Sequence, residues 1–430
     1  MSGQTLTEKI LAGHAGRSRA RPGEILWVQV DLVMSHDLTM PSVLDNLQRL
    51  GDPTVFDRSG VCIVMEHVVP SHTVAHANMA KRIRDWADRQ GLRHFYDMGS
   101  HGIVHVFLPE MGIAAPGQLI LGADSHSCTM GVVGAFATGV GATDAAVAMA
   151  LGETWLKVPP TIGVELVGRP RPWITGKDIF LALLRRLGGD GALYKALEFS
   201  GAGLQQLGMD SRATLCNMAI EAGAKSGIVA PDSVTRAWLA ERPLPVAMDR
   251  AHLASDPDAE FDDLVRLDLS EVELTVSAPP SPDNVVPLGE VGEVHVDQVF
   301  IGTCTNGRLE DLRIAASILK GRKVARGTRL IVVPASQNVL LAAMREGLTE
   351  VFVEAGAIVG TPGCGPCHGL HMGPLADGDI GLYTANRNFP GRQGGKTSRV
   401  YLAGPAVAAA TAVAGHIAGP ETIDRALVPA

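Results

Sequence analysis

The chain has 430 residues, 46% of them hydrophobic, which is enough for about two to four domains of roughly 100–200 residues each. The formal net charge of −8 and the lack of a long basic segment argue against a nucleic-acid partner. Six cysteines in a chain of this length do not make a disulfide scaffold, and they fit a reducing compartment.

Neither a secretory signal nor a membrane span is indicated. The N-terminal residues include Glu8 and Lys9 and hold no apolar segment of the kind a signal peptide needs. The most apolar late segment, Leu402 to Ala418, contains Pro405 and His416 and falls short of the ~20 strongly apolar residues that a span requires. We therefore expect a cytoplasmic protein without a membrane partner.

Apolar segments of strand length alternate with segments of helical periodicity. Aromatic residues make up only 4% of the chain and glycines number 49, which favours α/β layers with close helix–sheet packing. The predicted strands are Ile25–Met34, Val61–Met65, Gln118–Leu121, Thr161–Val167, Gln298–Ile301, Leu330–Val333 and Val351–Val353. The predicted helices are Leu6–Ala12, Thr73–Gln90, Lys177–Leu187, Arg212–Ala224, Leu309–Leu319 and Gln337–Glu346.

A proline-rich segment, Ala278 to Asn284, is the clearest linker signal and predicts a domain boundary. Beyond it, strands and helices alternate in a βαβ pattern. We expect three α/β domains, at residues 1–130, 131–283 and 284–430. The second domain could be interleaved with the first.

Polar residues follow several of the early strands directly. Glu66 and His67 come after Val61–Met65, and Asp124 and His126 come after Gln118–Leu121. In open α/β sheets, ligands bind beside the carboxyl ends of the strands, so this placement predicts a binding site. A lone His126 could instead be a core histidine satisfied by Asp124, since most buried polar groups find partners.

Three cysteines lie on glycine-rich turns in the last third of the chain. Cys364 and Cys367 have the C-x-x-C spacing that can ligate one metal centre, and Cys304 would join them from a distant turn. Three thiolates are one short of the set for an iron–sulfur cluster, and with His368 a zinc site is also possible, so the residues leave both open. An incomplete ligand set leaves a metal position that can act as a Lewis acid.

Three further charged residues are candidates on chemical grounds. Glu198 lies in an apolar segment, and burial would raise its pKa toward the range of a proton carrier, although an edge-strand position would make it a surface residue. Arg387 and Arg392 could be surface cations, but paired arginines beside asparagines suit bidentate carboxylate recognition.

Four segments resemble the aconitase superfamily, and they occur in that family's order. They are the two cysteine segments, Gly122-Ala123-Asp124-Ser125-His126, and Asn386-Arg387-Asn388-Phe389-Pro390-Gly391-Arg392. The chain is most similar to the large subunits of 3-isopropylmalate dehydratase and to homoaconitase-like relatives, from about Leu6 to about Ile417. The resemblance implies three α/β domains around a central cleft that holds a [4Fe-4S] cluster with one iron not ligated by protein.

The activity that the resemblance implies is that of a hydro-lyase. It would isomerise a hydroxy dicarboxylic acid by dehydration and rehydration, with 3-isopropylmalate and 2-isopropylmalate, in leucine biosynthesis, as the leading pair. A homoaconitase-like enzyme or another substituted-malate isomerase is the alternative. A metal-dependent regulatory or RNA-binding protein is the alternative from a different class, and the net charge of −8 argues against it.

The resemblance also implies residue roles and a partner. The base would come from a separate small subunit carrying the swivelling domain, since the chain ends thirteen residues after Ile417. Three positions depart from the family's usual residues: Glu66 for aspartate, Gly307 for serine and His368 for an aliphatic residue. The implied cluster ligands are Cys304, Cys364 and Cys367; the catalytic residues are Glu66, His67, His105, Asp124, His126 and Glu198; the substrate-binding residues are Ser125, Asn386, Arg387 and Arg392.

Overall fold

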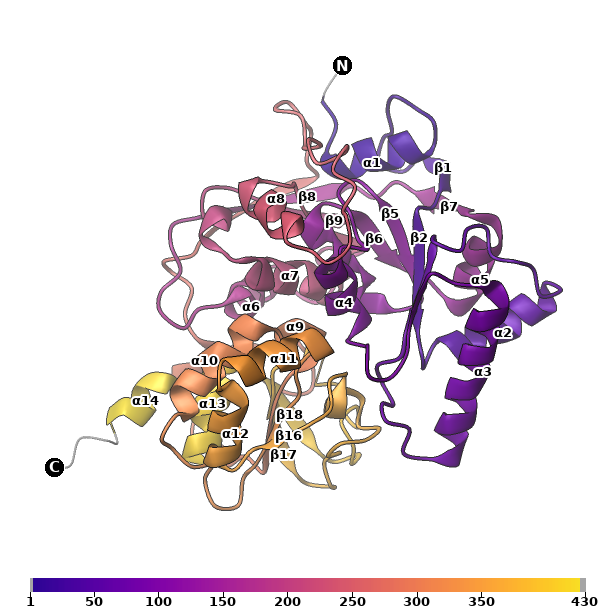
Figure 1. The fold of residues 1–430 in the computed structure, drawn as a ribbon. Helices are drawn as coiled ribbons and strands as arrows, with labels where there is room; N and C mark the ends of the chain where they lie inside the picture. Colours follow the sequence, from indigo (N-terminus) through magenta and orange to yellow (C-terminus); the bar gives the residue numbers. More distant parts are fainter. Residues whose placement is uncertain (1–2, 426–430) are drawn as a thin grey trace. The chain divides into compact units, whose positions relative to one another are not determined.

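The structure is a computed structural model and describes residues 3–425. Contacts divide the chain into two compact units: unit 1 holds residues 1–168 and 190–268, and unit 2 holds residues 169–189 and 269–430. Figure 1 shows the helices and strands of both units. Among the described residues, no helix is both long and apolar enough to cross a membrane.

Unit 1 contains a five-stranded parallel sheet in the order β4-β3-β2-β5-β6. Its central strands are fully buried, and Figure 1 shows α2, α3 and α5 on one side of the sheet and α4 on the other. The strands are β2 (Leu32–His36), β3 (Val61–Val64), β4 (His94–Tyr96), β5 (Leu119–Gly122) and β6 (Phe136–Gly139). The helices are α2 (Met40–Arg49), α3 (Val74–Gln90), α4 (Val104–Met111) and α5 (Ala142–Leu151).

The prediction of one strand over Ile25–Met34 is wrong, because the chain forms two strands there. β1 (Ile25–Gln29) pairs antiparallel with β7 (Glu153–Lys157) as a separate ribbon, and β2 begins at Leu32. Between them, the Asp31 carboxylate accepts a hydrogen bond from the Leu119 backbone N–H at 2.8 Å and contacts His14 at 2.7 Å. These bonds fix a break that the apolar pattern does not reveal.

Unit 1 also holds a four-stranded parallel sheet in the order β10-β9-β8-β11. The predicted helix Arg212–Ala224 is only partly confirmed, because the α-helix ends at Met218 and a 3-10 turn, η3 (Ala219–Ala222), follows. The strands are β8 (Thr161–Val167), β9 (Ala196–Ser200), β10 (Ser226–Val229) and β11 (Asp263–Asp268). The helices and 3-10 turns of this region are η1 (Ser125–Val133), η2 (Leu204–Gln206), α7 (Met209–Met218) and α8 (Ser233–Ala240), and α1 (Leu6–His14) begins the unit.

Unit 2 is built on a seven-stranded sheet in the order β13-β12-β18-β17-β14-β15-β16, parallel from β18 to β16. The strands are β12 (Thr275–Ser277), β13 (Val285–Pro287), β14 (Gln298–Ile301), β15 (Arg329–Val332), β16 (Ile358–Val359), β17 (Ile380–Tyr383) and β18 (Arg399–Leu402). The helices are α6 (Gly176–Leu187), α9 (Thr303–Asn306), α10 (Leu309–Leu319), α11 (Gln337–Arg345), α12 (Leu348–Ala355), α13 (Pro405–Ala414) and α14 (Pro420–Arg425), with 3-10 turns η4 (Leu288–Glu290) and η5 (Gly365–His368).

The predicted strand Val351–Val353 is wrong, because these residues lie within α12. Phe352 and Ala355 are its buried residues, and their i, i+3 spacing is helical, whereas the Val-Phe-Val triplet alone suggests a strand. The mixed α/β fold with parallel sheets is confirmed. The division into three domains stays a prediction; the three larger sheets span residues 32–139, 161–268 and 275–402.

Candidate active site

The polar residues of unit 1 gather at the carboxyl ends of three neighbouring strands, and we call them the polar wall: His36, Asp37, Glu66, His67, His105, Asp124 and His126. His36 ends β2, while Glu66 and Asp124 each come two residues after the ends of β3 and β5. The sheet order places β2 between β3 and β5, so connections leave β2 in both directions. Such a switch point in a parallel sheet is where ligands bind.

Asp37 fixes the chain that carries His67. Its carboxylate accepts the backbone N–H of His67 at 3.0 Å and that of Val68 at 2.9 Å, and it is fully buried. Burial alone would raise the pKa of Asp37, but the bond with His67 and the nearby His36 outweigh it and hold the pKa well below its usual range. Asp37 is therefore a buried carboxylate that anchors the loop after β3.

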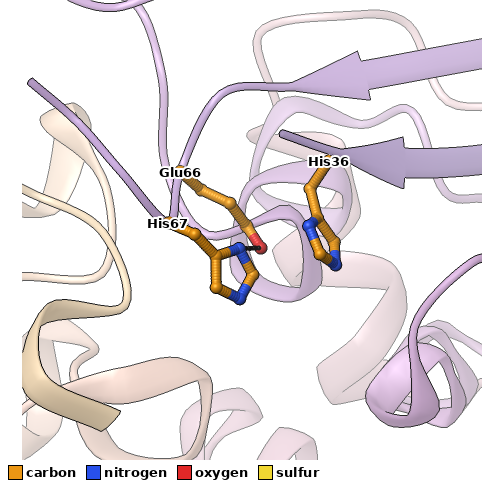
Figure 2. A group of neighbouring side chains, drawn as sticks. All are labelled: His36, Glu66 and His67. Carbon is orange, nitrogen blue, oxygen red and sulfur yellow. Dashed lines mark ion pairs between the residues drawn. The ribbon is translucent and has the colours of Figure 1, made fainter. Parts of the chain in front are cut away.

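Glu66, His67 and His36 lie together in this wall, as Figure 2 shows. Glu66 Oε1 is 3.0 Å from His67 Nδ1, at ion-pair distance. Glu66 Oε2 accepts the backbone N–H of Val104 at the start of α4. The rings of His36 and His67 lie 4.2 Å apart between centroids. The longer Glu66 thus keeps its contact with the His67 ring.

Asp124 links three histidines. Its carboxylate contacts His105 Nε2 at 2.8 Å and His36 Nε2 at 3.3 Å, and it accepts the backbone N–H of His126 at 2.7 Å. Burial acts to raise the pKa of Asp124, yet these histidines together lower it well below the usual value. An ionised Asp124 fixes the orientation of the His105 ring and stabilises a proton on any of the three rings.

Glu221 is a site residue that sequence reasoning missed. Its Oε1 lies 2.8 Å from His126 Nε2, and both residues are buried. The contact of His126 Nδ1 with Asp124 is longer, at 3.6 Å. The available signal was a carboxylate inside an otherwise apolar segment, the same signal that singles out Glu198. His126 thus has its own carboxylate partner, as His67 has Glu66.

Of the two other predicted residues of unit 1, Ser125 contacts the polar wall, with its Oγ 3.4 Å from His126 Nδ1, whereas Glu198 lies outside these contacts. Glu198, in β9, accepts a hydrogen bond from Ser255 Oγ at 2.5 Å, and burial raises its pKa. Ser255 and the neighbouring Leu6 are not part of the polar wall, so the contacts of Glu198 do not join it to the histidines. Ser125 lines a cavity of about 280 Å³ with Thr138, Gly139, Val140, Gly141, Ile220 and Lys225.

In unit 2, the three predicted metal ligands are buried cysteines that form no disulfide. Cys304 follows β14 in α9, and the residue before it, Thr303, has φ +75°. A β-branched residue in this conformation is a strained outlier of the kind that clusters at functional sites. Cys364 directly precedes the 3-10 turn after β16 and Cys367 lies within it, and Gly365 between them has φ +55°.

The loops after β14, β15, β16 and β17 meet at one edge of the sheet. Gly302 N–H donates to Thr384 Oγ1 at 3.0 Å, and Gly363 N–H donates to the Pro334 carbonyl at 3.4 Å. The Asn386 side-chain amide donates to Cys304 Sγ at 3.3 Å. Because β14 lies between β15 and β17, this edge is also a switch point.

Buried polar atoms surround these loops. Among the described residues, Arg392 Nε, Asn306 Oδ1 and Arg308 Nη2 are buried without a hydrogen-bond partner. Such atoms are rare in folded proteins, and a bound ligand, ion or water here would satisfy them. Three buried thiols, an amide donor to sulfur and close glycine turns fit a sulfur-ligated cluster. The zinc alternative is less well supported, because His368 Nε2 accepts a hydrogen bond from Arg392 Nη2 at 3.2 Å.

The predicted substrate-binding segment follows β17. Its Arg387 backbone carbonyl accepts a hydrogen bond from Gln393 Nε2 at 2.7 Å. Sequence reasoning missed Lys177, whose fully buried side chain on α6 donates to the carbonyl of Ala385, next to Asn386. A charged group so placed holds the backbone beside the cysteines.

Comparison with known proteins identifies the family of the chain. The model of the aconitase family (aconitate hydratase) matches residues 8–415. The 3-isopropylmalate dehydratase large subunit of Moorella thermoacetica is 50% identical over 421 residues, 98% of this chain and 99% of that protein. The large subunit of Heliobacterium modesticaldum is 48% identical over 98% of this chain and 100% of that protein. Large subunit 1 of Pyrococcus abyssi is 48% identical over 98% of this chain and 99% of that protein.

A solved structure, the holo form of Thermococcus kodakaraensis aconitase X, aligns with 84% of this chain over 84% of its own chain. The TM-score is 0.48 and the sequence identity is 11%, and no argument is based on this likeness. The family match covers nearly the whole chain, and aconitase-family membership implies an iron–sulfur cluster, which the three buried cysteines fit. The chain therefore belongs to the aconitase family.

Proposed function

We propose that this chain is the cluster-bearing large subunit of a hydro-lyase that interconverts 3-isopropylmalate and 2-isopropylmalate by dehydration and rehydration. The observation that carries this proposal is the 50% identity, over 98% of the chain, to a 3-isopropylmalate dehydratase large subunit. All thirteen residues of the predicted site are described, and every one except the half-buried Ser125, Asp124 and the two arginines is fully buried. We place the reaction in the cytoplasm.

The cofactor of the proposal is a [4Fe-4S] cluster held by Cys304, Cys364 and Cys367. Its iron without a protein ligand would supply Lewis-acid activation of the substrate hydroxyl. Asn386 supports this assignment, because its amide donates to Cys304 Sγ at 3.3 Å, and hydrogen bonds to the sulfurs tune such clusters.

The residues of the polar wall would move the proton that the departing hydroxide requires. Two histidine–carboxylate pairs suit this role: His67 with Glu66 at 3.0 Å and His126 with Glu221 at 2.8 Å. In each pair the carboxylate orients one ring nitrogen and stabilises the imidazolium. The other nitrogen of His126, Nδ1, lies 3.4 Å from Ser125 Oγ and 3.6 Å from Asp124. Asp124 would keep His105 fixed beside them.

The arginines would hold the substrate carboxylates. Arg392 has a buried Nε without a partner among the described residues, while its Nη2 is held by His368. A guanidinium held at one nitrogen presents its remaining N–H groups in a fixed fork, which suits bidentate binding of a carboxylate. We assign Arg387, Asn386 and Ser125 to the same small anionic dicarboxylate.

The partner in this proposal is a separate small subunit that carries the catalytic base and much of the side-group pocket. The support is that the similar proteins of Moorella thermoacetica, Heliobacterium modesticaldum and Pyrococcus abyssi are large subunits. No nucleic acid or membrane takes part.

The test is a substrate panel assayed by absorbance of the unsaturated intermediate, with the anaerobically reconstituted chain and its small subunit. The panel contains malates substituted with isopropyl, carboxyethyl, methyl and phosphonomethyl groups. We expect the highest kcat/KM for 3-isopropylmalate. A higher value for the carboxyethyl compound would assign the enzyme to the homoaconitase-like class instead.

A further inference from the structure

The ribbon formed by β1 and β7 carries two tryptophans on its outer face. Trp27 and Trp155 are direct partners in the antiparallel register, and they are 61% and 55% exposed. Directly opposite residues project from the same face of a ribbon, so the two indoles lie side by side. Ile25, 67% exposed, is the next outward residue. The chain has only five tryptophans, and two of them occupy this patch.

The ribbon is anchored to unit 1 by its inner face. Leu26 and Val28 alternate with the exposed residues, are each 1% exposed, and belong to the core that includes Leu6 and Ile10 of α1. Figure 1 shows the ribbon beside α1, with β5 on its inner side. The tryptophans are therefore presented on a fixed surface, and exposed apolar surface of this kind marks an interaction site.

The charges on the same face point to a particular occupant. Lys157 lies at one end of the outward row, opposite Ile25, and Glu153 lies at the other end, opposite Gln29. Gln29 Nε2 donates to Glu153 at 2.8 Å, and Lys157 Nζ lies 5.7 Å from the centre of the Tyr194 ring. In the part of the chain that the structure describes, neither Lys157 nor Glu153 forms an ion pair.

We propose that a second copy of this chain covers the face, with the two ribbons packed face to face around a twofold axis. An axis that crosses both strands at the Trp27–Trp155 pair reverses the strand direction of the second copy. Each tryptophan then meets its own counterpart, and Lys157 of either copy lies against Glu153 of the other. The face is complementary to itself in the placement of its tryptophans and charges, and an isologous dimer requires a self-complementary face.

Neighbouring residues extend the contact at the Lys157 end. Leu193 is 67% exposed and Tyr194 is 37% exposed, and the Lys157 side chain lies over the Tyr194 ring. This arrangement gives an apolar centre of two tryptophans and a rim of opposite charges, the anatomy of protein interfaces. None of these residues belongs to the polar wall or to the cysteine loops.

The experiment is sedimentation velocity on the cluster-reconstituted chain, alone and with its small subunit. We expect a species with twice the 45.2 kDa chain mass that dissociates on dilution. Lys157→Glu and Glu153→Lys each place like charges together and should raise the dimer dissociation constant at least about tenfold. The double variant Lys157→Glu/Glu153→Lys restores opposite charges and should return it toward the value of the unchanged protein.

The double variant Trp27→Ser/Trp155→Ser should abolish the dimer. Leu264→Ser, at a residue that is 71% exposed on β11, is the matched control and should leave it intact. Circular dichroism and the cluster spectrum check that each variant is folded. A chain that stays monomeric, or a dimer that the charge variants leave unchanged, would overturn the proposal. So would a tryptophan variant whose only defect is weaker binding of the small subunit.

Discussion

At the scale of single residues, the site depends on buried carboxylates that hold histidines. Asp37 binds backbone N–H groups and lies 3.4 Å from the His67 ring, and Asp124, Glu66 and Glu221 also contact imidazole rings. Sequence analysis identified Asp124 and Glu66, because they directly follow strands. It missed Glu221, since only the folded chain brings residue 221 to His126.

Asp124→Asn removes the charge that holds three histidines while keeping the size of the side chain. We expect kcat to fall by about 10²–10⁴-fold, the usual contribution of a positioned proton-transfer group. Circular dichroism and the visible cluster spectrum should be unchanged. Wild-type turnover in a fully folded Asp124→Asn protein would show that the polar wall does not serve the reaction.

Asp37→Asn tests a structural role and has a definite pH dependence. The folded-state pKa of Asp37 is lowered, so its stabilising effect is present above the unfolded pKa of about 3.9 and is lost as pH falls toward the folded value. Denaturant unfolding at neutral pH should show a loss of about 1–3 kcal/mol in the variant. The difference in unfolding free energy between the variant and the unchanged protein should shrink steadily below about pH 4. A difference that does not depend on pH would contradict the role assigned to the Asp37 carboxylate.

His368→Leu places an aliphatic residue where the family usually has one. It removes the acceptor for Arg392 Nη2, so we expect KM for the substrate to rise about fivefold to tenfold, the effect of about one hydrogen bond to a charged group. The cluster spectrum and kcat should change little. His368→Gln, whose amide oxygen can accept the same bond, should recover part of the loss; an unchanged KM in both would remove His368 from substrate binding.

At the scale of elements, much of the fold could be predicted because buried parallel strands give continuous apolar segments. Val61–Met65 and Gln298–Ile301 are confirmed as β3 and β14 within one residue at each end. The failures occur where side chains override periodicity: Asp31 divides the first strand, and Val351–Val353 lies in α12. The φ +75° of Thr303 beside Cys304 has no signal in the sequence at all.

Gly365→Ala tests the turn that joins the two cysteines of the C-x-x-C segment. Gly365 has φ +55°, and an added Cβ would lie 3.1 Å from Val333 Cγ2. We expect strain of about 1–2 kcal/mol and reduced iron and sulfide content after reconstitution. Gly347→Ala is the matched control, since Gly347 has φ +73° with nothing within 4 Å. Equal cluster content in the two variants would contradict the role of this turn.

At the scale of the whole molecule, the proposed reaction draws on residues of both units. Unit 1 supplies the polar wall, and unit 2 supplies the cysteines and arginines. Spacing and residue type could predict both sets, because each follows the ends of strands. The partners of Glu198 could not be predicted, because Ser255 reaches it from a distant loop.

The most direct measurement is hydration activity of the cluster-reconstituted chain titrated with its small subunit. We predict negligible turnover from the chain alone and a steep rise that saturates near an equimolar ratio, as expected if the base lies on the partner. Cys304→Ala should assemble no cluster and stay inactive, whereas the buried Cys216→Ala should behave like the unchanged chain. Full activity from the isolated chain, or an active Cys304→Ala protein, would contradict the account.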